Sequence, residues 1–177
     1  MAVEQFNLAQ NQRAERKLLI TVAEWNETEG TTTTQKREIL GRRTEDSSIE
    51  FNPDIQTSTD ILGINYTDVN KTQPQQDFDP YLVLGGSKLG AFLYDKMMRN
   101  ALSELSGFKL YVISAFIGDS TNGYKTVRHD DCTIMANSLG GDANVNMPIS
   151  VYFSNKVTAG TVDKLTDDFE FTPDVTI

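Results

Sequence analysis

The sequence predicts a mainly β fold, a two-sheet β-sandwich or barrel with one flanking α-helix at about residues 87–103. Two observations lead to this prediction. One stretch has a convincing amphipathic helical pattern, whereas seven or eight other stretches have strand character and are separated by turn residues. Because a single amphipathic helix needs an apolar surface to cover, and strands flank it on both sides, that surface must be a sheet.

The predicted helix follows the glycine pair at 85–86, and Ser87 is suited to be its N-cap. The large apolar residues of the helix recur at spacings of three and four and therefore share one face: Leu89, Phe92, Leu93 and Met97. We expect this face to pack on the strand predicted at 108–117.

The expected strands lie, in chain order, at residues 17–25, 37–41, 49–55, 59–69, 108–117, 126–136 and 147–155. The strand at 108–117 is the most apolar, and we expect both of its faces to be covered. Asn122-Gly123 is a strong signal for a hairpin turn between the strands at 108–117 and 126–136. The Gln-rich stretch at 70–78 is expected to be a connector.

A chain of 177 residues favours one domain, which we place at 17–157. A polar N-terminal arm precedes it at 1–16, and an acidic segment follows at 158–177. Residues 26–35 form a polar, Thr-rich loop or long hairpin, and such loops in compact domains are usually functional. We expect the arm and this loop to mediate assembly by adding strands to a neighbour's sheet edge, with candidate residues Asn26, Glu29, Gly30, Thr31 and Thr32. A mobile surface loop is the alternative.

The composition argues against several classes of function. The net charge is −9 and the pI is near 4.6, which disfavours tight wrapping of nucleic acid. A single cysteine excludes an intrachain disulfide and a multi-cysteine zinc site, and the N-terminus lacks the apolar core of a signal peptide. We expect a reducing compartment, no enzymatic activity, no cofactor, no bound metal and no membrane anchor.

Three stretches invite a chemical interpretation, and each has a simpler one. Residues 128–132 hold the only His and the only Cys, but on a regular strand His129 and Cys132 point to opposite faces and cannot pair without a bulge. A half-buried structural thiol is the better hypothesis. Residues 119–130 fit a calcium loop poorly, since glycine comes one position too early. The segment LGGSKLG lacks the order of a phosphate-binding loop and fits a helix N-terminus.

Three segments together resemble the major tail protein, or tail-tube protein, of long-tailed bacteriophages and prophages: ILGRRTEDSSIEFNPDIQTSTDILGINYTDVNKTQPQQDFDPY, SKLGAFLYDKMMRN and DDCTIMANSLGGDANVNMPISVYFSN. The resemblance lies in the order of strands, polar connector, single helix, hairpin and small-residue turn. It implies a tail-tube-like sandwich whose copies form hexameric rings, and rings that stack into a tube for genome ejection. It also implies that the arm and the inter-ring loop at about 26–35 link successive rings. It also implies a virion protein made in the host bacterial cytoplasm, with tail tip, tape measure and tail terminator proteins as partners.

In such a tube, double-stranded DNA passes through without specific binding. We expect the lumen to be lined mainly by strands between residues 37 and 69, with a negative or near-neutral potential, because a basic wall would hold the DNA. Arg42 and Arg43 are expected at a subunit or ring boundary, paired with carboxylates such as Glu45 or Asp46 or with those of the acidic C-terminal region. The competing hypothesis is a monomeric Ig-like module that binds or decorates a virion or a cell surface.

The sole thiol provides a test. Replacing Cys132 with Ser should leave assembly intact and lower the melting temperature only modestly, because the thiol is expected to have a packing role. Electron microscopy and thermal melting of the variant check this. A variant that folds but no longer assembles, or stoichiometric metal in the parent protein, contradicts it.

Overall fold

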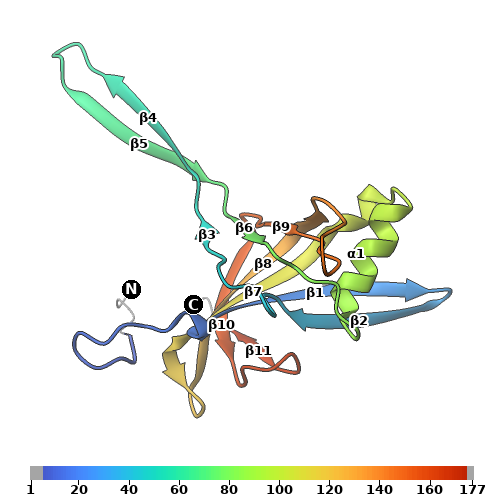
Figure 1. Cartoon of the computed structure of the whole chain (residues 1–177). Helices are drawn as coiled ribbons and strands as arrows, with labels where there is room; N and C mark the ends of the chain where they lie inside the picture. Colours follow the sequence, from blue (N-terminus) through green and yellow to red (C-terminus); the bar gives the residue numbers. More distant parts are fainter. Residues whose placement is uncertain (1–5, 175–177) are drawn as a thin grey trace.

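The computed structural model describes residues 6–174, and its main body is a nine-stranded antiparallel sheet covered by one helix (Figure 1). The strand order is β2-β1-β7-β8-β9-β6-β3, with β10 paired to β8 and β11 paired to β10. The four long strands are β1 (Leu19–Glu29), β2 (Thr32–Ile39), β7 (Ser106–Asp119) and β8 (Gly123–Ala136). The short ones are β3 (Ile49–Glu50), β6 (Gln75–Phe78), β9 (Ile149–Tyr152), β10 (Val157–Val162) and β11 (Phe171–Pro173). A separate two-stranded sheet, β4-β5, completes a mainly β, sandwich-like fold, as the sequence predicts.

The helix α1 (Lys88–Met98) ends earlier than the sequence suggests. Asn100 adopts a left-handed conformation, with φ 55°, and the N–H of Ala101 donates to the Lys96 carbonyl at 2.9 Å. This bonding pattern closes a helix C-terminus, and asparagine tolerates the left-handed conformation better than most residues. A short 3-10 helix at Leu102–Leu105 then leads into β7.

The predicted apolar face of α1 lies on the sheet. Leu89, Phe92 and Leu93 are buried, and Met97 packs against the same core. The Phe92 ring meets Phe108 of β7 edge-on, with 5.9 Å between centroids, which is a favourable aromatic geometry. This core is the larger of two and occupies one face of the sheet.

The N-terminus of α1 is bound by a buried carboxylate from β2. Glu38 accepts hydrogen bonds from the backbone N–H groups of Lys88 at 2.6 Å and Leu89 at 3.0 Å. Its other oxygen accepts from the Ser87 hydroxyl at 2.7 Å, and the Ser87 hydroxyl oxygen in turn accepts from the Gly90 N–H. These contacts satisfy N–H groups that a helix end leaves without partners. The chain's own Glu38 therefore occupies the place that a bound phosphate would take.

The C-terminal segment covers the opposite face of the sheet, so the predicted boundary at residue 158 is wrong. Val162 and Phe169 are buried in a second core with residues of β1 and β7. The guanidinium of Arg37 donates to the Phe169 carbonyl at 2.7 Å and lies 4.5 Å from the centroid of the Phe169 ring. A few apolar residues among many acidic ones are enough to fix this segment, which explains why its composition is misleading.

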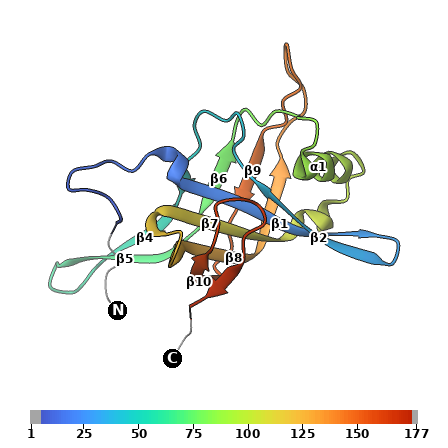
Figure 2. The same cartoon turned by 90° about the horizontal axis from the view of Figure 1, so that it is seen from below.

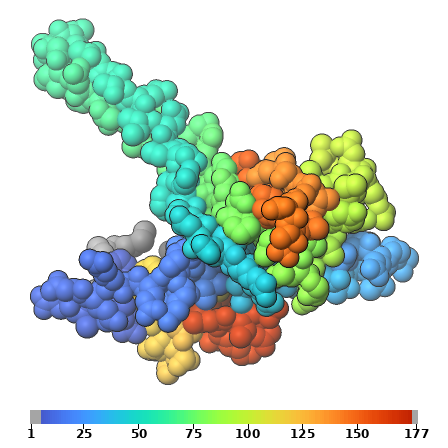
Figure 3. All heavy atoms as spheres, in the orientation of Figure 1, coloured from blue at the N-terminus to red at the C-terminus, as the bar shows by residue number. Residues whose placement is uncertain are grey.

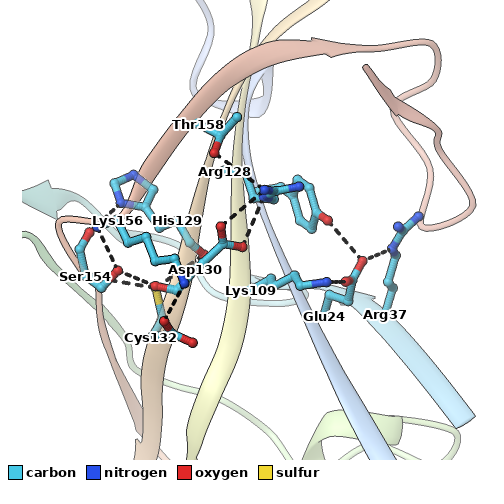
Figure 4. A network of polar contacts seen from close by, with 12 residues as sticks. Glu24, Arg37, Lys109, Arg128, His129, Asp130, Cys132, Ser154, Lys156 and Thr158 are labelled. Atoms are coloured by element: carbon cyan, nitrogen blue, oxygen red, sulfur yellow. Dashed lines mark hydrogen bonds and ion pairs between the residues drawn. The ribbon is translucent and has the colours of Figure 1, made fainter. Parts of the chain in front are cut away.

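Arg37 also belongs to a buried polar network centred on Glu24, whose side chain is 2% exposed (Figure 4). The Glu24 carboxylate accepts from Arg37 at 2.5 Å, from Lys109 at 3.1 Å and from the Tyr111 hydroxyl at 3.1 Å. Burial alone raises the pKa of Glu24, but the hydrogen bonds and charges of Arg37 and Lys109 outweigh it and hold the pKa below its ordinary value. Burial and the neighbouring Glu24 charge raise the pKa of Tyr111 to about 12.

Residues 26–35 are the end of a regular hairpin, which is one of the two forms expected from the sequence, since the β1–β2 pairing continues to Glu29 and Thr32 with a turn at Gly30. Residues 75–78 are the strand β6 instead of a connector. The buried side chain of Gln76 is hydrogen-bonded to the Thr21 and Ser47 hydroxyls, at 2.8 and 3.1 Å, which lets a polar stretch enter the core.

Replacing Phe92 with Ala should lower the free energy of unfolding by about 3–5 kcal/mol, because it empties the centre of the larger core. Denaturant titration measures the loss. Tyr94→Ala is the matched control, since Tyr94 lies on the same helix and is 47% exposed. An unchanged transition midpoint for Phe92→Ala would mean that this face does not carry the core.

Candidate functional site

The most exposed regular element is the hairpin of β4 (Pro53–Thr59) and β5 (Asn65–Thr72), which projects from the body (Figures 1 and 3). Its two strands pair only with each other. Every residue of β4 and all of β5 except Thr72 are exposed. The sequence predicts strands at 49–55 and 59–69, and the structure shifts them to Pro53–Thr59 and Asn65–Thr72, with the turn of the hairpin between them. That strands between residues 37 and 69 line a lumen stays a prediction.

Apolar side chains are concentrated on and beside this hairpin. Ile61 and Leu62 at its tip have exposed fractions of 103% and 77%. The other large exposed apolar residues of the hairpin and its base are Phe51, Ile55, Ile64, Tyr66 and Val69. A two-stranded ribbon without a packed face is only marginally stable in water, and clustered exposed apolar surface marks sites of interaction. The hairpin is therefore the candidate functional site, and it requires a partner surface.

The tip of the hairpin is held in one conformation by Asp60. Its carboxylate accepts from the N–H groups of Leu62 at 2.8 Å and Ile64 at 2.9 Å, and from the Tyr66 hydroxyl at 3.2 Å. The hydrogen bond from Ile64, together with those from Leu62 and Tyr66, lowers the pKa of Asp60 below its ordinary value. Gly63 completes the turn with φ +79°. The exposed side chains of Ile61 and Leu62 are thus held on an ordered turn, which lowers the entropy cost of binding a partner.

The five assembly residues predicted in 26–35 lie on a second projecting hairpin. Asn26, Glu29, Gly30, Thr31 and Thr32 are all exposed at the end of the β1–β2 ribbon. Figures 1 and 2 show this ribbon and the β4–β5 hairpin at opposite ends of the molecule. β2 is also an end strand in the order of the large sheet, so its outer edge is open to another strand.

Arg42 and Arg43 are exposed in the turn after β2, and Arg43 has φ 61°. Within residues 6–174, neither has a carboxylate within ion-pair distance, and Glu45 and Asp46 make no ion pair either. The expected pairing is not found among the described residues of one copy, and pairing between copies stays a prediction.

The His129–Cys132 region departs from a regular strand. Asp131 has φ 60°, and two residues of β8 oppose one of β7 between the Leu110–His129 and Phe108–Cys132 pairs, which defines a bulge. The expectation of opposite faces is therefore wrong. The His129 Nδ1 nevertheless contacts the Ser154 carbonyl at 2.9 Å, and Cys132 is fully buried, not half-buried as predicted. Burial raises the pKa of its thiol. In the part of the chain described, no three His, Cys, Asp or Glu side chains are grouped to hold a metal ion.

Comparison with known proteins gives no relationship, since no family model matches the sequence and no curated protein matches it. No helix within residues 6–174 is long and apolar enough to cross a membrane.

Sequence reasoning missed the hairpin tip as a functional element. Its signal was present, since Asp60 and Gly63 are turn residues that flank exposed apolar ones. Leu62, Ile64 and Tyr66 are spaced like the apolar face of a strand, and this spacing is the same whether the chain itself or a neighbouring molecule covers that face.

Replacing Asp60 with Ala should release the tip without unfolding the body. Amide exchange at Leu62 and Ile64 should accelerate, because both N–H groups lose their acceptor, while the melting temperature stays within a few degrees of the parent. Hydrogen exchange followed by NMR measures the change. Asp54→Ala is the control, since Asp54 lies on the same hairpin, is exposed and has no side-chain hydrogen bond among those found. Equal exchange in both variants would show that Asp60 does not order the tip.

Proposed function

We propose that this protein is a structural subunit that self-assembles into stacked hexameric rings forming a phage tail tube, the conduit for genome ejection. The observation that carries the proposal is the β4–β5 hairpin, which has an ordered tip and two uncovered faces. Such an element needs a surface outside its own fold, and many copies of one chain in an assembly supply such surfaces.

The placement of the two hairpins supports the same proposal. They project from opposite ends of the molecule, so the surfaces that they offer to a neighbour are different (Figure 2). Contacts between unlike surfaces of identical chains generate closed rings or open-ended stacks, whereas self-complementary patches stop at a dimer. The open edge of β2 suits lateral joining of sheets, and the longer reach of β4–β5 suits contact with a more distant copy.

The N-terminal arm has the character of an assembly segment. Among its described residues, Asn7 is held by a backbone bond to the Phe116 carbonyl at 2.8 Å, and Phe6 meets the Phe116 ring edge-on at 5.6 Å. The stretch from 7 to 15 is otherwise largely exposed and contributes nothing to either core. The part of the predicted arm at residues 1–5 lies outside the described residues.

The charge of the chain also suits a conduit. Asp and Glu outnumber Lys and Arg by 25 to 16, so copies of the chain carry a net charge of the same sign as DNA, which favours passage of double-stranded DNA without lasting contacts. Tail tip, tape measure and tail terminator proteins would be the partners at the ends and in the bore of the tube.

Electron microscopy of the concentrated protein should show rings or tubes. Replacing Ile61 and Leu62 together with Ser should abolish them, because the change removes the apolar tip while the body keeps its melting temperature. Met98→Ser is the matched control, since Met98 is 64% exposed on α1, away from the hairpin. Featureless small particles from the parent protein at every concentration would instead favour the monomeric Ig-like binding or decoration module.

A further inference from the structure

The large sheet carries an apolar groove beside the base of the β4–β5 hairpin. The groove has a volume of about 650 Å³, which is in the size range of sites that hold a bound ligand or a few inserted side chains. Val112 of β7 and Val127 of β8, which are paired in register, form its floor, and Val157 of β10 and Phe51 stand at its sides.

The groove is an uncovered part of the face that α1 covers elsewhere. Val112 packs against the larger core, and Phe153 belongs to both that core and the groove lining. The helix contacts the half of the sheet near Phe108, whereas the groove lies towards the start of β1, where Leu19 lines it. Val157 remains 51% exposed there. The core of the protein thus opens to the surface at this place.

The chain's own hairpin tip cannot fill this groove. Phe51 lines it and is followed at once by β4, whose 7 residues span roughly 23 Å at about 3.3 Å per residue. The hairpin then extends away from the body, so its tip lies a strand's length from its own base (Figure 3). A tip that enters the groove must come from another molecule.

The charges of the hairpin and the groove are complementary. The hairpin and its turn carry Asp54, Asp60 and Asp68 against a single cation, Lys71. No Asp or Glu lines the groove, and Arg16 stands at its rim. The Arg16 guanidinium donates to the backbone carbonyls of Ser47 and Leu19, and no ion pair is found for it within residues 6–174. An acidic hairpin therefore meets a cation whose charge is not neutralised.

We propose that the tip of the β4–β5 hairpin of one copy, with Ile61 and Leu62, docks in the apolar groove of a second copy of this chain. The proposal rests on the proposed self-assembly and specifies its contact. Each copy then gives one tip and receives one, a head-to-tail contact that repeats without limit. Docking of the tip also covers the two apolar side chains at the end of the hairpin and fills the opening in the larger core.

Site-specific cross-linking tests the contact. In the Cys132→Ser background, one preparation carries Leu62→Cys and the other carries Val157→Cys. The two are mixed under assembling conditions and treated with a short bifunctional thiol reagent. We expect a covalent dimer of the two variants. The control pair is Leu62→Cys with Leu102→Cys, because Leu102 is 55% exposed but does not line the groove, and it should give little product.

A second variant tests the groove by function. Val157→Asp adds a carboxylate beside the path of an acidic hairpin and should raise the concentration needed for assembly by about tenfold or more, as loss of an interface contact does. Its melting temperature reports whether the body remains folded. Val83→Asp, at a residue 46% exposed outside the groove, is the control.

The outcomes separate the two proposals. Assembly with the Leu62–Val157 product supports both. Assembly without that product, or with the Leu62–Leu102 product in its place, overturns the docking site and leaves the tube subunit standing. If the parent protein remains monomeric and no cross-link forms, both proposals are overturned.

Discussion

Two consecutive residues of β2 fasten the layers on both faces of the sheet. Because side chains of a strand alternate, Arg37 and Glu38 point to opposite sides. Glu38 binds the N-terminus of α1, and Arg37 binds Glu24 and the carbonyl of Phe169 in the C-terminal segment. The helix and the C-terminal segment lie on opposite faces of the sheet, and both are bound to the edge strand β2. Each charge is met by several hydrogen bonds, which is the condition under which a buried ionic group is tolerated.

Local features of this fold were predictable, and long-range ones were not. The helix face and the Ser87 cap follow from spacing and from residue type within a few positions. The hydrogen bond between Glu38 and the Lys88 N–H joins residues 50 positions apart in the sequence. No periodic pattern of residues predicts such a contact. The role of the C-terminal segment was hidden for a similar reason, since Val162 and Phe169 are two apolar residues in an acidic context. Their partners lie on β1 and β7, far away in the chain.

The candidate site was harder to predict because its apolar residues are exposed, whereas apolar residues in a strand are usually buried. A strand with alternating apolar residues normally lies on a core, and the stretch 61–66 satisfies that pattern, with Leu62, Ile64 and Tyr66 two residues apart. The structure leaves these side chains in solvent and leaves an apolar opening in the body beside Val112 and Val127. The hairpin and the opening are two halves of a packing arrangement that one copy does not complete. The polar Thr-rich ribbon, which the sequence singles out, is only one of two projecting elements.

The strand order of the large sheet has a consequence for how the chain folds. The central pairing joins β1 to β7, so that Leu19 meets Ser114 only after most of the chain has been made. The β4–β5 hairpin, in contrast, joins residues that are close in sequence, and such ribbons form in ~1–10 μs. Closure of distant strands is much slower. During synthesis both strands of the hairpin are therefore made before β7, the partner of β1, and the apolar side chains of the hairpin are exposed during that interval.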